Sequence, residues 1–235
     1  MTQRNDKRLR ILFYSLWILS LVVQAYFTDL LGDEAYYWMY SRKFSWGYFD
    51  HPPVTALLIR AGYLLFKNEL GVRLLFILSG TLAIYIWECI IKPRDLRIFY
   101  SLVLSVGVLH FYTFLALPDA PLLLSASLFF LLYRKFIQHP DWKISLMLSI
   151  VGSFMILSKY HGFLIVGLTV LSNLRLMRNK YFWLAVAGAV FLLLPHFLWQ
   201  LDAGFPSLRY HLLERSQDPY HVNNTLNTWG HSLLS

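Results

Sequence analysis

Two short polar motifs interrupt the apolar first part of this sequence. Asp33 and Glu34 follow the first long apolar segment, and Asp50 and His51 stand before two prolines. A carboxylate can take a proton from an attacking nucleophile, and a carboxylate beside an imidazole can bind a metal ion or a phosphate. Each motif also has a purely structural explanation, as an acidic helix end beside an aromatic belt or as an Asp cap before a proline-started helix. The residue types alone leave both explanations open.

Lys159 is an isolated cation inside a later apolar stretch. An ionisable residue at membrane depth indicates a functional site unless its side chain reaches the headgroups. A cation fixed in advance would stabilise negative charge that develops on a leaving phosphate. Lys159 is therefore a candidate for phosphate chemistry.

The composition indicates a membrane protein. Hydrophobic residues make up 57% of the chain and charged residues 14%, against about 25% charged in a typical soluble domain. The formal net charge is +8, but the basic residues stand in short clusters between apolar segments, which argues against nucleic-acid binding. Cys89 is the only cysteine, so no disulfide can form within the chain.

Several apolar segments approach the length of about 20 residues that a membrane-spanning helix needs. The segments are residues 9–27, 72–91, 98–117, 121–136, 144–157, 161–174 and 181–199. We therefore expect an all-α, polytopic membrane helical bundle of about seven transmembrane helices. Residues 1–235 form a single membrane-embedded domain in this interpretation.

The basic clusters predict how the chain lies in the membrane. If the amino terminus is cytoplasmic, residues 92–97, 134–143 and 175–180 are cytoplasmic too, as the positive-inside rule requires. The first two motifs, Asp119 and Lys159 then share the opposite side. We expect a multi-pass protein of the inner (plasma) membrane with an extracytoplasmic site.

Residues 28–71 form a long first extracytoplasmic loop, which is expected to contain its own helices. An aromatic-rich stretch over residues 34–43 is suited to the membrane interface, and Pro52 and Pro53 suit a helix start. We predict two interfacial helices joined at residues 47–51.

In their order along the chain, the motifs resemble the C-type glycosyltransferases, which include protein O-mannosyltransferases and bacterial aminoarabinose transferases of lipid A. The resemblance rests on Asp33-Glu34, Asp50-His51-Pro52-Pro53, Pro118-Asp119-Ala120-Pro121, Ser158-Lys159-Tyr160-His161-Gly162 and Pro195-His196. It covers almost all of the chain. Members of that superfamily are usually about twice as long, so we expect this chain to be an amino-terminal portion, truncated at the C-terminus.

The resemblance implies a membrane glycosyltransferase that transfers a hexosyl or pentosyl group from a polyprenyl-phosphate donor to a lipid, glycan or protein acceptor. It assigns Asp33 as the general base and Asp119 as a second catalytic residue, and direct attack at the anomeric carbon would invert it. The implied substrate-binding residues are Glu34, His51, Lys159 and Tyr160. A bound divalent metal ion is also implied, with Asp50, His51, His211 and Glu214 as candidate ligands.

A different class of function is a transporter or lipid-binding membrane module without catalysis. Asp33, Asp119 and Lys159 would then line a polar cavity. Transporter charges concentrate near the bilayer midplane, whereas these residues stand at segment ends on one predicted face. That placement favours the enzyme, although neither the sugar nor the acceptor follows from the residues.

Overall fold

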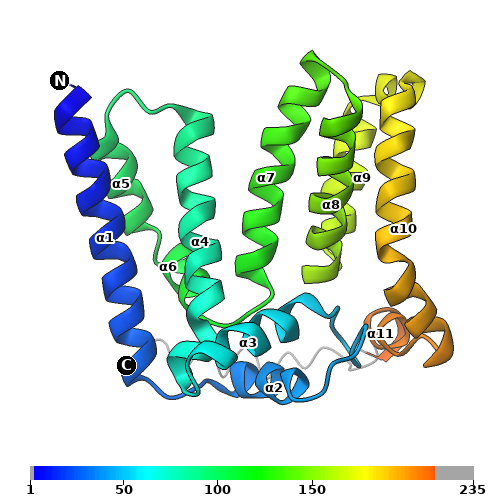
Figure 1. Ribbon diagram of the computed structural model, residues 1–235, viewed down its shortest axis with the longest axis horizontal. Helices are drawn as coiled ribbons and strands as arrows, with labels where there is room; N and C mark the ends of the chain where they lie inside the picture. Colours follow the sequence, from blue (N-terminus) through cyan, green and yellow to red (C-terminus); the bar gives the residue numbers. More distant parts are fainter. Residues whose placement is uncertain (1–2, 215–235) are drawn as a thin grey trace, which may run out of the picture.

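The computed structural model describes residues 3–214 as a bundle of helices without strands in that range (Figure 1). The helices that run between the two ends of the bundle are α1 (Gln3–Phe27), α4 (Glu69–Ile91), α7 (Asp119–Gln138), α8 (Trp142–Ser158), α9 (Gly162–Ser172) and α10 (Lys180–Asp202). Two shorter helices, α5 (Leu96–Ser105) and α6 (Gly107–Phe114), form a pair bent by 75°. The remaining helices are α2 (Gly32–Ser41), α3 (Val54–Leu65), η1 (Leu174–Arg178), α11 (Pro206–Arg209) and η2 (Tyr210–Glu214).

The all-α membrane class is confirmed, but the count of seven spans is not. Among the described residues, 4 helices are long and apolar enough to cross a membrane, or up to 5 if the bent pair counts as one span. Helix α8 has 17 residues and α9 has 11. The predicted segments 144–157 and 161–174 correspond to these two helices, which are shorter than the about 20 residues that a span needs.

The two ends of the bundle carry different residues. The connections that follow α4, α7 and α9 contain the basic clusters and lie at the same end as the amino terminus (Figure 1). Helices α2, α3 and α11 gather at the opposite end. We call these the basic end and the site end.

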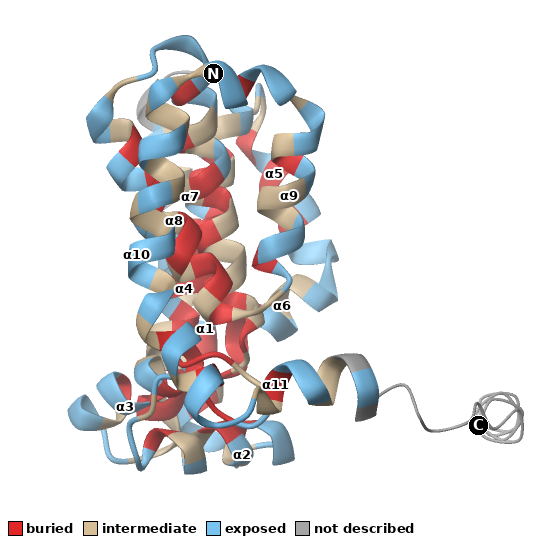
Figure 2. Cartoon of the chain, turned by 90° about the vertical axis from the view of Figure 1, so that its right-hand side faces the viewer, coloured by how far each residue is buried: buried red, intermediate tan, exposed pale blue. Residues whose placement is uncertain are grey.

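The outer surface of the bundle is apolar, as expected for helices surrounded by lipid. Figure 2 shows buried residues along the inward faces of α4, α7 and α8, with exposed residues outside them. Phe76, Ile77 and Ile84 of α4 are completely buried, whereas Phe191 of α10 is 73% exposed. The core therefore lies between α4 and its neighbours.

The first loop contains the two expected helices, α2 and α3. Helix α3 begins directly after Pro52 and Pro53 and turns back into α4, which Asn68 caps by accepting a hydrogen bond from the Gly71 N–H at 3.2 Å. A Cβ atom on Gly71 would lie 1.8 Å from the carbonyl oxygen of Phe66, so only glycine fits this turn. The tight turn holds α3 and α2 against the start of α4.

Candidate active site

Asp33 and Glu34 are neighbours on α2 but have opposite environments. Successive residues of a helix point about 100° apart, and here Glu34 is completely buried while Asp33 is exposed. Arg73 binds both Glu34 oxygens, with Nε 2.8 Å from Oε1 and Nη2 2.6 Å from Oε2. The Ala116 N–H also donates to Glu34, at 2.9 Å. Asp33 accepts no hydrogen bond from any residue between 3 and 214, so its carboxylate is available to a ligand.

Arg73 holds this part of the site together, a role that was not predicted from the sequence. Its guanidinium also donates to the carbonyl oxygens of Ala25 at 3.3 Å, Thr28 at 2.8 Å and Asp29 at 2.7 Å, at the otherwise unpaired end of α1. It lies over the ring of Phe114, 4.6 Å from the centroid. Arg73 thus joins α1, α2, α4 and α6. Its signal was present in the sequence, since it is an isolated cation in an apolar segment, as Lys159 is.

Aromatic side chains of α2 hold the Asp50-His51 pair. The hydroxyls of Tyr36 and Tyr40 donate to Asp50 Oδ1 at 2.9 and 3.3 Å, and the Tyr37 hydroxyl lies 3.0 Å from His51 Nε2. His51 Nδ1 lies 3.0 Å from Asp50 Oδ2. Burial acts to raise the pKa of Asp50, but His51 and the Tyr36 hydroxyl outweigh it and lower that pKa below its ordinary value. Asp50 is therefore held as a carboxylate.

Three carboxylates from separate segments lie around Tyr37. Burial raises the pKa of Tyr37, and the charges of Asp50, Asp33 and Asp119 raise it further. The Tyr37 hydroxyl contacts His51, and the ring packs in one buried cluster with Ala116 and Ala120 around the start of α7. The fold therefore brings three predicted site residues from α2, the loop before α3 and the start of α7 into one region.

Asp119 and Lys159 form an ion pair at the same end. Asp119 is the first residue of α7, and Lys159 directly follows α8. The Lys159 Nζ atom lies 2.7 Å from Asp119 Oδ1, and the two side chains are 26% and 25% exposed. The pair is formed but still open to a ligand.

A polar network connects Tyr160 to α10 and α11. The Tyr160 hydroxyl lies 3.2 Å from His196 Nε2 and accepts a hydrogen bond from Gln200 at 2.9 Å. Gln200 also donates to Ser207, which donates to the carbonyl oxygen of Tyr48, each at 2.9 Å. Burial raises the pKa of Tyr160, so its hydroxyl keeps its proton at neutral pH. Tyr160 can therefore act as a hydrogen-bond donor.

The loop that carries Asp50 packs directly on α10. His196 Nδ1 lies 2.6 Å from the carbonyl oxygen of Trp46. A Cβ atom on Gly47 would lie 2.3 Å from the Trp199 ring, so the close approach requires glycine. Helix α10 therefore fixes one side of the site.

The predicted metal ligands are only partly brought together. His211 Nε2 lies 2.9 Å from the backbone oxygen of Asp50, and its ring centroid lies 6.4 Å from that of His51. Glu214 ends η2, and its side chain lies outside the described residues. Within residues 3–214, no group of three His, Cys, Asp or Glu side chains is placed to hold a metal ion. These side chains do not fit a complete ligand set, and the divalent metal stays a prediction.

A comparison with known protein families found one match that covers most of these elements. The family described as dolichyl-phosphate-mannose-protein mannosyltransferase matches residues 50–199, which is more than half of the 235 residues. The matched range contains Asp50, His51, Asp119 and Lys159. Neither curated proteins nor solved structures gave a match.

Proposed function

Because this chain belongs to the dolichyl-phosphate-mannose-protein mannosyltransferase family and is a membrane glycosyltransferase of that type, we propose that it takes its sugar from a polyprenyl-phosphate donor. The reaction takes place at the site end of the bundle. The observation that carries the proposal is that the exposed Asp33, the Asp50–His51 pair and the partly exposed Asp119–Lys159 pair lie at the same end of the bundle.

Asp33 is the general base in this mechanism. It takes the proton from the acceptor hydroxyl or amine while that atom forms a bond to the anomeric carbon. The bond between that carbon and the phosphate oxygen breaks, and its electron pair leaves with the phosphate. Direct attack through an oxocarbenium-like transition state inverts the anomeric carbon. The exposed, unpaired carboxylate of Asp33 supports this role over Glu34, whose oxygens are already bound by Arg73 and the Ala116 N–H.

Lys159 stabilises the leaving phosphate. Its ammonium is held by Asp119 and remains partly exposed, so it can bind phosphate oxygens without first leaving a buried pair. Asp119 fixes Lys159 and lies at the rim of the site near the acceptor. We assign substrate contacts to His51 and the Tyr160 hydroxyl, and we assign to Glu34 the positioning of Asp33.

The site end faces the extracytoplasmic side of the inner membrane in this proposal. The basic connections after α4, α7 and α9 lie at the opposite end, where the positive-inside rule places the cytoplasm. The acceptor is a lipid, glycan or protein available on the outer face.

The test is a transfer assay with the full-length protein in proteoliposomes. A panel of polyprenyl-phosphate sugars that includes mannose is compared with the matching nucleotide sugars, and the anomeric configuration of the product is determined by NMR. We expect transfer with inversion from a polyprenyl-phosphate donor alone, on the face where a Ser45→Cys variant reacts with an impermeant maleimide. Transfer from nucleotide sugars, retention, or reaction on the other face would contradict the proposal. Movement of intact donor across the bilayer without transfer would favour a transporter.

A further inference from the structure

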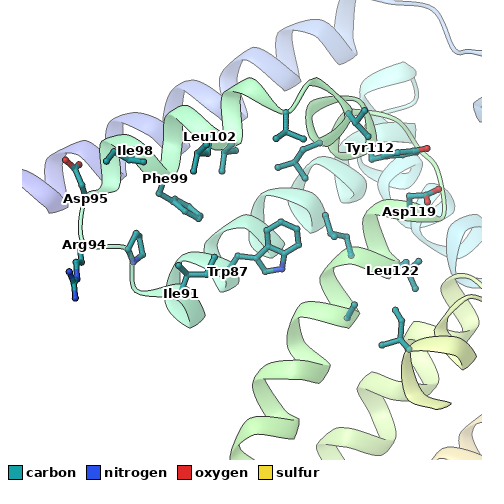
Figure 3. Close-up of a pocket in the computed structure, with 18 residues that line it drawn as sticks. Trp87, Ile91, Arg94, Asp95, Ile98, Phe99, Leu102, Tyr112, Asp119 and Leu122 are labelled. Atoms are coloured by element: carbon teal, nitrogen blue, oxygen red, sulfur yellow. The ribbon is translucent and has the colours of Figure 1, made fainter. Parts of the chain in front are cut away.

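An apolar cavity of about 780 Å³ lies between α4, the bent α5–α6 pair and α7. Figure 3 shows the residues that line it, with Arg94 and Asp95 at one extremity and Asp119 at the other. The walls between them are apolar side chains such as Phe99 and Leu122. This volume is within the range of about 300–1,000 Å³ that is typical of pockets for small molecules.

The far wall of the cavity is fixed by contacts on the other side of α5. The Tyr100 hydroxyl donates to the Glu88 carboxylate at 2.9 Å, and the Tyr100 ring stacks on Phe13 with centroids 4.0 Å apart. Glu88 is buried in α4 and also binds Arg10, with Nη2 2.6 Å from Oε1. These contacts hold α5 against α1 and α4. Helix α5 is therefore kept apart from α7, and the space between them is maintained by the fold.

The one tryptophan among the lining residues has its indole N–H already bonded, so it is not available to a polar ligand. The Trp87 Nε1–H, on a residue that lines the cavity, donates to the Ser127 hydroxyl at 2.6 Å. Water in a cavity needs two to four polar partners, and most of the lining side chains are hydrocarbon. The chemistry of the walls therefore suits a hydrocarbon chain.

The mouth at the basic end carries positive charge. Arg94 lines it with an exposed side chain, Lys92 is exposed in the same connection, and Arg97 is exposed in the first turn of α5. Asp95 also lines the mouth, but its carboxylate is engaged with the Arg97 N–H at 2.8 Å as the cap of α5. Basic pockets between membrane helices at this level attract anionic lipid headgroups.

We propose that this cavity binds one anionic phospholipid, with its phosphate at Arg94 and an acyl chain along the apolar walls toward Asp119. The headgroup then lies at the basic end, and the chain fills the space that α5 leaves beside α7. This assignment does not depend on the proposed transferase reaction. The competing occupant is a polyprenyl phosphate whose head lies at Lys159, at the opposite end of the cavity.

The charge at the mouth is tested with the full chain purified in mild detergent and titrated with phosphatidylglycerol. Native mass spectrometry measures how much lipid stays bound. Wild-type protein should retain one phospholipid, and Arg94→Ala should weaken retention about fivefold, because each basic residue near an anionic headgroup contributes about that factor. Arg178→Ala removes an exposed cation from the same end, away from the cavity, and should leave retention unchanged.

The hydrocarbon part of the cavity is tested by filling it. Ala126→Phe places a ring among the lining residues and should displace the lipid. Ala187→Phe adds the same ring on the exposed face of α10 and should not. Thermal unfolding shows whether each variant is folded, and Arg94→Ala decides the question if Ala126→Phe does not fold.

Three results would overturn this proposal. They are the absence of bound phospholipid in wild-type protein, equal loss in Arg94→Ala and Arg178→Ala, and co-purified polyprenyl phosphate that Lys159→Ala releases. None of them bears on whether Asp33 is the base, so this proposal and the proposed function can fail separately.

Discussion

Two ion pairs of a basic residue with a carboxylate at the site end, Arg73–Glu34 and Lys159–Asp119, differ in their access to solvent. Arg73 and Glu34 are 1% and 0% exposed, whereas Lys159 and Asp119 are 26% and 25% exposed. The shortest distances are nearly the same, 2.6 and 2.7 Å. Distance therefore does not distinguish a pair that holds the fold from a pair that is open to a ligand, whereas burial and the number of partners do.

The choice of cation agrees with this difference. Arginine presents a planar set of donors and binds a carboxylate through two of them, and Arg73 uses the remaining donors on three carbonyl groups. Lysine is a compact charge on a flexible chain, and Lys159 has one carboxylate partner. The first pair is suited to fixing helices and the second to meeting a phosphate.

Removing Arg73 should have the largest effect on stability. Arg73→Met leaves Glu34 buried without its cation, so the free energy of unfolding should fall by about 3–5 kcal/mol. Unfolding in detergent micelles measures this, with Arg60→Met as the matched loss of an exposed cation on α3. The double variant Arg73→Met/Glu34→Leu should recover part of the loss. Equal losses in Arg73→Met and Arg60→Met would show that burial does not distinguish the two pairs.

Removing Lys159 should separate activity from stability. Lys159→Met breaks a partly exposed pair, so unfolding should change by only about 1 kcal/mol. Transfer should slow by about 10²- to 10³-fold, as when a donor to a developing anion is removed. Lys67→Met is the control, because Lys67 is exposed on the connection between α3 and α4. A loss of stability as large as that of Arg73→Met would assign Lys159 to the fold.

The smallest expected effect concerns Asp50 and pH. The pKa of Asp50 is lower in the folded protein than in the unfolded chain, where it is about 3.9. The ionised carboxylate therefore stabilises the folded protein above about pH 3.9, and this stabilisation is lost as the pH falls through the folded-state pKa. Tyr36→Phe removes one hydrogen bond that lowers this pKa, so the acid-dependent loss should become smaller. The free energy of unfolding, measured between about pH 5 and 3, shows this change. Tyr26→Phe is the control, because Tyr26 is an exposed tyrosine on α1. An unchanged pH dependence would remove Tyr36 from the Asp50 site.

The class of fold and the grouping of the site residues could be predicted because they depend on local patterns. Apolar segments alternate with basic clusters, so Asp119 and Lys159 had to share an end with the first loop. The helix count was less accessible, since hydropathy does not show that α8 and α9 are only 17 and 11 residues long or that α5 and α6 form a bent pair. Pro52 and Pro53 marked the start of α3 for the same local reason.

Features that depend on packing between distant segments could not be predicted. The sequence marks Arg73 as an isolated cation but does not show that its partner is Glu34 on another helix. Which of Asp33 and Glu34 faces inward depends on how α2 packs against α4. The cavity depends on the 75° bend between α5 and α6 and on the Tyr100–Glu88 contact, and neither has a local signature.

The central claim is that Asp33 reacts while its neighbour Glu34 holds the fold. Asp33→Asn and Glu34→Gln make the same chemical change at adjacent positions, and each variant is measured for transfer, donor affinity and thermal unfolding. Asp33→Asn should slow transfer by about 10²- to 10⁴-fold with donor affinity and the unfolding midpoint unchanged. Glu34→Gln should lower the unfolding midpoint, because it removes the charge that Arg73 pairs with. Wild-type transfer by Asp33→Asn, or a loss confined to donor affinity, would contradict the account.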